Sequence, residues 1–211
     1  MKKIELLFVS LLVTGWVFAQ QKEIIPDLSK VNDTTIWHLS DRELLSDNPV
    51  HLSKGEDDGI LWLKDSSFEN GTIELDIKGR DIRGESFVGM AFHGIDRNNF
   101  ELIYFRPFNF KSPEKKDNAI QYVSTPDFTW QKLRKEHPGV YENAITPVPN
   151  PNGWFHASIV VDFPQIKVFI NNSDEASFTV EQISTRKSGW IGFWVGSNSE
   201  GQFKNLKIVK K

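Results

Sequence analysis

The stretch Gly189-Trp-Ile-Gly-Phe-Trp-Val-Gly196 decides the fold of this chain. Side chains alternate between the two faces of a β-strand. One face therefore carries Ile191, Phe193 and Val195, and the other carries Trp190, Gly192 and Trp194. At ~3.3 Å per residue, the two indoles stand roughly 13 Å apart with a glycine between them. The apolar face is expected to lie in the hydrophobic core. The indole face predicts either a stacking surface for a ring-shaped ligand or two aromatics packed beneath a loop.

Short apolar stretches separated by turn residues continue along the chain. We expect strands at 35–39, 59–64, 71–78, 87–93, 100–106, 155–162, 165–171, 176–180, 190–195 and 202–209. Two hairpins follow from the turns at 94–98 and 163–164. No long segment shows helical periodicity. This spacing predicts one all-β domain, an antiparallel sandwich or barrel.

Small residues are a second feature of the predicted outer faces. In the strand 87–93, Phe87, Gly89, Ala91 and His93 lie opposite the apolar Val88, Met90 and Phe92. Gly192 occupies a comparable position in the opening strand. Because glycine weakens a strand interior, we expect these small residues to form a depression where a ligand approaches the backbone.

Residues 107–153 interrupt the pattern. This segment holds seven of the ten prolines but also six aromatic residues, and only 119–123 within it predicts a strand. Long connections inside a domain are usually functional or disordered, and the aromatic content argues against disorder. We expect an ordered crossover loop across one face of the sandwich. It either shapes a pocket or only packs its own aromatic cluster.

The N-terminus predicts a signal peptide at residues 1–19, which leaves one domain at 20–211. Lys2 and Lys3 precede a short apolar stretch that ends at Ala19. The stretch is too short for a membrane span, and without cysteine there is neither a disulfide nor a lipid anchor. The remaining chain carries 23 basic and 27 acidic residues, a net charge of −4, which argues against nucleic acid as a partner. We therefore expect a secreted or periplasmic protein.

The strand ends and turns together resemble a known superfamily. The motifs are Asn70-Gly71-x-Ile73-Glu74, Val88-Gly-Met-Ala-Phe-His93, Asn99-Phe-Glu-x-Ile-Tyr-Phe-Arg-Pro107 and the opening strand. They resemble the concanavalin A-like lectin/glucanase superfamily. Within it, the chain is most similar to laminin-G-like domains of bacterial secreted proteins and to the 3-keto-disaccharide hydrolase group. The resemblance implies an antiparallel jelly-roll β-sandwich with a ligand cleft on its concave face.

The resemblance implies a carbohydrate ligand. Trp130, Trp190 and Trp194 would stack on sugar rings. Hydrogen bonds to hydroxyls or to a uronic carboxylate would come from Tyr104, Arg106, Gln121, Tyr122 and His93. Arg106 stands just before Pro107, where the strand must end, so it could point into a cleft or pair with a neighbouring acid.

A glycoside-cleaving enzyme of the same fold is the second hypothesis, and a laminin-G-like protein-interaction module is the third. For the enzyme, His93 and Glu101 on neighbouring strands are candidate acid and base, although such a pair is more often structural. Glu74-x-Asp76-x-Lys78 places a lysine where laminarinase-type hydrolases of this fold have a second carboxylate, so that mechanism is not expected. No cofactor and no metal site are predicted from the spacing of the histidines. The resemblance allows a structural calcium ion at Asn32-Asp33 or Asp57-Asp58.

Overall fold

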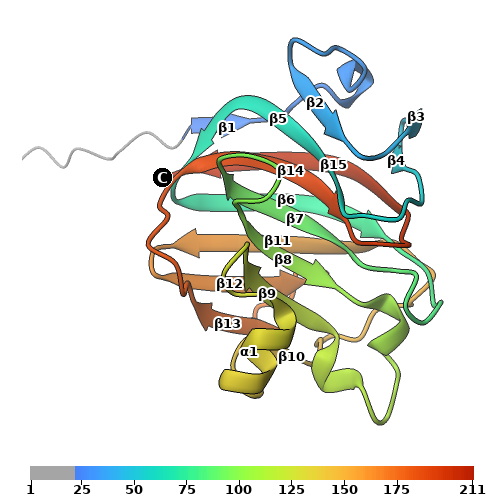
Figure 1. Ribbon diagram of the computed structural model, residues 1–211, viewed down its shortest axis with the longest axis vertical. Coiled ribbons are helices and arrows are strands. Elements are labelled where there is room, and N and C mark those ends of the chain that lie inside the picture. The colour runs from blue at the N-terminus through green and yellow to red at the C-terminus, as the bar shows by residue number, and fades with distance from the viewer. Residues whose placement is uncertain (1–21) are drawn as a thin grey trace, which may run out of the picture.

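The computed structural model describes residues 22–211, and the predicted signal peptide lies outside this range. Two antiparallel sheets pack face to face (Figure 1). The eight-stranded sheet contains, in spatial order, β13 (Phe178–Glu181), β12 (Gln165–Ile170), β11 (Phe155–Asp162), β6 (Gly71–Lys78), β15 (Gly201–Lys210), β4 (Val50–Leu52) and β3 (Leu44–Asp47), with β1 (Lys22–Ile24) paired to β15. The seven-stranded sheet contains β10 (Glu142–Asn143), β9 (Ile120–Ser124), β8 (Glu101–Phe105), β7 (Val88–Gly94), β14 (Gly189–Val195), β5 (Gly59–Phe68) and β2 (Trp37–Ser40).

The expected jelly-roll sandwich is therefore confirmed. Both predicted hairpins form, between β7 and β8 and between β11 and β12. The sequence pattern missed the short strands β1, β3, β4 and β10, which contain only two to four residues each. Such short strands lack the repeats that make alternation readable.

The hydrophobic core fills the space between the sheets. Ile191, Phe193 and Val195 of β14 point into it and are fully buried, as the alternation predicts. The Phe193 ring stacks on Phe203 of β15 with centroids 4.7 Å apart, which joins the two layers. Burying such side chains contributes about 1.5–3 kcal/mol each.

A second, smaller apolar cluster covers the outer face of the seven-stranded sheet. It contains Trp194 of β14 together with Ile60, Trp62, Ala91, Phe100, Leu102, Tyr104, Val123 and Leu133. Leu133 comes from the helix α1 (Trp130–Glu136), which packs beside β9 (Figure 1). The hydroxyl of Thr129 accepts a hydrogen bond from the Lys132 amide and so caps the start of this helix.

The segment 107–153 is an ordered part of the sandwich. It adds two strands, β9 and β10, to the edge of the seven-stranded sheet and places α1 on the outer face of that sheet. The helix was not expected, because seven residues are too few for a readable helical period.

The polar face formed by Glu74, Asp76 and Lys78 lies on the outer side of the eight-stranded sheet. Their neighbours Ile73, Leu75 and Ile77 are fully buried in the core. Asp76 pairs with His156 at 2.9 Å, and Glu74 pairs with Lys207 at 3.3 Å. Both carboxylates thus have local partners, on the sheet opposite to the cavities described below.

Candidate ligand-binding site

The outer face of the seven-stranded sheet carries a cavity of about 300 Å³, here called the aromatic cavity. Its lining consists of Asp58, Phe87, Leu102, Tyr104, Val123, Thr125, Thr129, Trp130, Gln131, Trp194, Gly196 and Ser197. Strands supply the apolar floor, and loops supply the polar rim. The volume lies at the lower end of the range for small-ligand sites, about 300–1,000 Å³.

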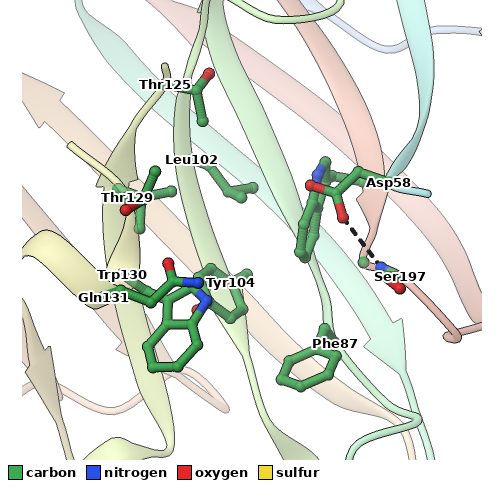
Figure 2. Close-up of a pocket in the computed structure, with 12 residues that line it drawn as sticks. Asp58, Phe87, Leu102, Tyr104, Thr125, Thr129, Trp130, Gln131 and Ser197 are labelled. Atoms are coloured by element: carbon green, nitrogen blue, oxygen red, sulfur yellow. Dashed lines mark hydrogen bonds between the residues drawn. The ribbon is translucent and has the colours of Figure 1, made fainter. Parts of the chain in front are cut away.

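Two walls face each other across this floor. In Figure 2, Trp130 and Gln131 stand on one side, Asp58 and Ser197 stand on the other, and Tyr104 lies between them. The Ser197 amide donates a hydrogen bond of 3.0 Å to the Asp58 carboxylate, which ties the loop before β5 to the loop after β14. The cavity is therefore built where several loops meet above β8, β9 and β14.

The aromatic floor is continuous. The Tyr104 and Trp194 rings are tilted at 50° with centroids 5.2 Å apart, and Phe87 meets Tyr104 edge-on at 6.2 Å. Trp130 completes the aromatic surface from α1 and is 41% exposed, so its ring is available to a ligand. Aromatic side chains of this kind offer large apolar contact at low entropic cost.

A second cavity of about 310 Å³ adjoins the first and shares Phe87 and Trp130 with it. We call it the basic cavity, because its lining includes four cations and no Asp or Glu. The complete lining is Arg83, Gly84, Phe87, Arg106, Phe108, Asn109, Lys115, Asn118, Trp130 and Arg134. The shared residues place the two cavities side by side.

Arg106 is the most buried cation of the basic cavity, with only 5% exposure. Its guanidinium donates to the Tyr104 hydroxyl, to the Gln121 amide oxygen at 3.2 Å and to the Asn118 carbonyl at 2.9 Å. Burial lowers the pKa of Arg106, because removal from water disfavours the charged form. The alternative of an ion pair with a neighbouring acid is wrong, since no carboxylate in residues 22–211 lies within salt-bridge distance of it.

Tyr104 joins the two cavities chemically. Its ring forms floor in the aromatic cavity, while its hydroxyl bonds to Arg106. Burial raises the pKa of Tyr104 to about 12, so its hydroxyl stays protonated at neutral pH. The group can therefore donate and accept hydrogen bonds but carries no charge.

Asp58 is the carboxylate of the aromatic cavity. The residue is exposed at the rim, yet loss of solvation near the cavity wall raises its pKa. The hydrogen bond from the Ser197 amide and the charge of Arg42 act in the opposite direction. A carboxylate with a raised pKa is a better proton acceptor than an ordinary aspartate.

The structure separates the three tryptophans expected to stack on a ligand. Trp130 and Trp194 line the aromatic cavity, and Tyr104 lies there with them. Trp190 lies in a different depression with His38, Ser40 and Trp62. The continuous indole face expected along β14 is thus divided.

The side chain of Trp62 in β5 divides the indole face expected along β14. A Cβ atom added to Gly192 would stand 2.8 Å from Trp62 Cε3, so the indole already fills the space above this glycine. The space at Gly89 is also filled, because its Cβ would stand 2.2 Å from the Ile103 carbonyl oxygen and 2.7 Å from Tyr104 Cβ. The expectation that these glycines leave a depression for a ligand is wrong: backbone and side-chain atoms of the neighbouring strands already occupy the space.

His93 lies away from both cavities. A β-bulge places Phe92 and His93 of β7 opposite the single residue Ile191 of β14, and His93 adopts a positive φ of 49°. The extra residue breaks strict alternation, so the predicted outer-face position of His93 is wrong. Its ring is fully buried and packs against Phe68 and Phe92 of the core. Burial lowers the pKa of His93.

Glu101 is also fully buried and lines neither cavity. Its carboxylate accepts hydrogen bonds from the hydroxyls of Tyr122, Ser124 and Ser184 and from the Arg186 guanidinium at 2.6 Å. Each carboxylate oxygen thus already has a donor. This arrangement anchors the segment before β14 rather than presenting an acid to a ligand.

The remaining predicted residues are buried beneath the site. Gln121 shares the outer face with Tyr104 and supports Arg106, but its amide nitrogen donates to the carbonyls of Tyr122 and Tyr141. Tyr122 points to the inner face, and loss of solvation beside Glu101 raises its pKa. Of the predicted ligand-binding set, Trp130, Trp194, Tyr104 and Arg106 come together in the two joined cavities.

The sequence pattern missed the residues that loops and the helix contribute. The residues Asp58, Thr125, Thr129 and Ser197 lie in loops and Gln131 lies in α1, where strand alternation gives no orientation. Ser197 could have been predicted as a site residue, because it follows the opening strand directly. Phe87 could also have been predicted, because it shares the expected outer face with Gly89.

The calcium positions suggested by the resemblance already have partners. The Asp33 carboxylate accepts hydrogen bonds from the amide and hydroxyl of Thr35 at 2.9 and 2.6 Å. Arg42 supplies a positive charge beside Asp57 and Asp58. Residues 22–211 contain no group of three or more His, Cys, Asp or Glu side chains that could hold a metal ion. Calcium enters no step below.

Comparisons with known proteins agree with this architecture. The family model described as the 3-keto-alpha-glucoside-1,2-lyase-like domain matches residues 9–209. No curated protein sequence matches the chain. Within the described range, no helix is long and apolar enough to cross a membrane.

Solved structures share the fold at low sequence identity. The carbohydrate-binding module CBM66 from Bacillus subtilis has a TM-score of 0.60 at 16% identity, covering 82% of this chain and 94% of its own. A protein of unknown function with a galectin-like fold from the same organism has a TM-score of 0.59 at 14% identity, covering 90% and 98%. The exoplasmic/lumenal domain of VIP36, bound to calcium and Man3GlcNAc, has a TM-score of 0.58 at 12% identity, covering 90% of each chain.

Proposed function

Because the chain belongs to the 3-keto-alpha-glucoside-1,2-lyase-like domain family, we propose that it binds a carbohydrate in the aromatic cavity. The observation that carries the proposal is the pairing of an aromatic floor with a polar rim. Tyr104 and Trp194 form the floor, and Thr125, Gln131 and Asp58 belong to the rim. The names of two structural neighbours, a carbohydrate-binding module and a lumenal domain bound to Man3GlcNAc, support the same class of ligand.

The chemistry of a sugar ring explains why this combination suits it. A pyranose has faces of C–H groups and an edge of hydroxyls. The C–H faces gain contact with aromatic rings, and the hydroxyls need hydrogen-bonding partners. The rim offers hydroxyls from Thr125, Thr129 and Ser197, the amide of Gln131 and the carboxylate of Asp58. The small volume of the aromatic cavity suits one or two sugar units better than a long chain.

The test is binding to a glycan panel, followed by calorimetry on the glycans that bind. Trp130→Ala should weaken binding at least roughly tenfold, because exposed tryptophans at binding sites carry large shares of the affinity. Trp130 is 41% exposed, so its removal should leave the fold intact. Trp154→Ala is the matched control: this indole packs beneath Lys204 and lines neither cavity. Equal affinities of both variants and the parent would overturn the proposal.

A second candidate is an elimination reaction at the same site. In a 3-keto-glucoside the carbonyl at C3 acidifies the proton at C2. A base that removes this proton lets the C1–oxygen bond break, and the leaving oxygen takes up a proton. Asp58 favours this candidate, because it is the carboxylate of the aromatic cavity and its pKa is raised. Asp58→Asn should abolish cleavage of a 3-keto-glucoside while leaving its binding intact, and unchanged cleavage would exclude Asp58 as the base.

The cellular location is part of the proposal. We propose that the protein is exported, on the basis of the basic and apolar sequence of residues 1–19. N-terminal sequencing of the protein from the producing cell should begin near Gln20. A mature protein that still begins at Met1 would contradict export by this route.

A further inference from the structure

The basic cavity holds a concentration of positive charge that the overall composition does not explain. The chain has a formal net charge of −3, yet Arg83, Arg106, Lys115 and Arg134 line one cavity whose wall has no Asp or Glu. The Glu142 carboxylate accepts two hydrogen bonds from Nε and one from Nη2 of Arg134, and it forms a salt bridge with no other cation of this cavity. Within residues 22–211, Arg83 and Lys115 make no ion pair. Three of the four cations are therefore without a counter-ion.

Arg106 gives the second observation. Its side chain is almost fully buried, and its partners are a phenol, an amide oxygen and a backbone carbonyl, all of them neutral. A buried charge without a counter-ion costs free energy that its hydrogen bonds only partly offset. The rings of Tyr104 and Phe87 lie 4.7 and 6.0 Å from its guanidinium carbon and offer only the weaker attraction of π-systems. The Glu142 carboxylate acts on Arg106 only without direct contact, so the buried charge is only partly compensated.

The basic cavity lies directly beside the aromatic cavity. It shares Phe87 and Trp130 with the aromatic cavity, so a ligand seated on Tyr104 and Trp194 would lie next to the cations of the basic cavity. The Arg134 guanidinium lies 5.0 Å from the centre of the Trp130 ring, which brings charge to the boundary between the two cavities. Planar guanidinium groups match carboxylate and sulfate oxygens in pairs.

We infer that the ligand is an acidic glycan, whose sugar ring occupies the aromatic cavity and whose carboxylate or sulfate group occupies the basic cavity. This inference rests on the proposed carbohydrate function and narrows it to a substrate class. The carboxylate of a uronic acid and the sulfate ester of a sulfated sugar present the same anionic oxygens to Arg106. The experiment below distinguishes the two sources.

The experiment compares matched ligands by calorimetry: galacturonate and mannuronate oligosaccharides, their carboxyl-reduced neutral counterparts, and sulfated oligosaccharides with their desulfated forms. We expect at least one acidic ligand to bind roughly tenfold or more tightly than its neutral counterpart, because hydrogen bonds to charged groups contribute more than neutral ones. A preference among uronates identifies a carboxylate ligand, and a preference among sulfated sugars identifies a sulfate ligand.

Variants at the exposed cations test the site itself. Arg83→Gln combined with Lys115→Gln should reduce the acidic preference, without abolishing it because Arg106 and Arg134 remain, and should leave neutral binding unchanged. Both residues are exposed, so the fold should persist. Lys111→Gln combined with Lys116→Gln is the control, because it changes the net charge equally at exposed positions that do not line the basic cavity. Equal loss in both double variants would show a general charge effect and overturn the inference.

The failure of this inference differs from the failure of the proposed function. If acidic and neutral partners bind equally and Trp130→Ala still weakens both, the basic cavity is not an anion site, but the carbohydrate function stands. If no acidic or neutral glycan binds at all, both are overturned.

Discussion

The guanidinium of Arg106 lies over the ring of Tyr104, with its Cζ atom 4.7 Å from the ring centroid, and also donates a hydrogen bond to the Tyr104 hydroxyl. One tyrosine thus forms part of the aromatic floor and holds the buried cation of the neighbouring cavity. The two cavities should respond together to changes at this residue. Tyr104 is also almost fully buried, so the ionisation of its hydroxyl is linked to the stability of the folded state.

Alkaline pH should destabilise the protein through Tyr104. Its folded-state pKa of about 12 exceeds the ordinary value of 10.0. Between these pH values the unfolded state loses a proton that the folded state keeps, so stability is complete below about pH 10 and falls as pH rises. Over the full interval this amounts to roughly 2–3 kcal/mol.

Tyr104→Phe should reduce this loss, as measured by urea unfolding at about pH 9 and about pH 11. Part of the alkaline sensitivity should remain, because the pKa values of Tyr122 and Tyr141 are also raised by loss of solvation. A variant with the same pH slope as the parent protein would show that Tyr104 ionises as freely in the folded state as in the unfolded one.

Alternation along strands predicted the two layers and most of the aromatic floor. Ile191, Phe193 and Trp194 all occupy the faces assigned to them, because a regular strand has only two orientations to offer. The face of His93 was predicted wrongly, because a β-bulge in β7 shifts the alternation and a single sequence does not reveal such a bulge. The rim residues Asp58 and Ser197 were not predicted, because loop conformation depends on tertiary contacts.

The small residues Gly89 and Gly192 wrongly predicted a depression for a ligand, again because tertiary contacts decide what lies over them. Glycines at 89 and 192 mark close approach, but the sequence does not say whether a ligand or a neighbouring side chain approaches. Here Tyr104 and Trp62 fill the space. Pairing between strands that are far apart in sequence decides the outcome, and alternation within one strand contains no information about it.

Glu101→Gln should destabilise the fold without a direct effect on ligand binding. The substitution leaves the Arg186 guanidinium, 16% exposed, without its carboxylate partner. Breaking a buried ion pair from one side costs about 3–5 kcal/mol. Thermal unfolding should therefore shift to lower temperature, while glycan affinity measured well below the transition should stay within about twofold.

A suitable control for Glu101→Gln is Glu85→Gln, which breaks the exposed pair with Lys54. Exposed pairs contribute about 0–1 kcal/mol, so this variant should unfold almost like the parent protein. If Glu101→Gln were as stable as the control but failed to bind or turn over a ligand, Glu101 would have the direct functional role that its burial argues against.

Gly192→Ala should lower stability by about 1–3 kcal/mol, the usual cost of overpacking. The new Cβ would stand 2.8 Å from both the Leu61 carbonyl oxygen and Trp62 Cε3, and backbone cannot move aside as a side chain can. The free energy of unfolding in urea measures the loss. Gly153→Ala is the control, because its Cβ would approach nothing closer than Asn150 Cβ at 3.2 Å. Equal stabilities of the two variants would mean that Trp62 does not lie over Gly192.

Trp190 and Trp194 should behave differently although they share one face of β14. Trp194→Phe shrinks the floor beside Tyr104 and should weaken glycan binding several-fold while the remaining ring keeps the fold packed. Trp190→Ala removes the edge contact with Trp62, whose ring centroid lies 6.2 Å away, and should cost stability but leave affinity within about twofold. Calorimetric titration and thermal unfolding separate the two effects. If Trp190→Ala weakened binding as much as Trp194→Phe, the ligand would have to extend from the aromatic cavity across Trp62 into the second depression.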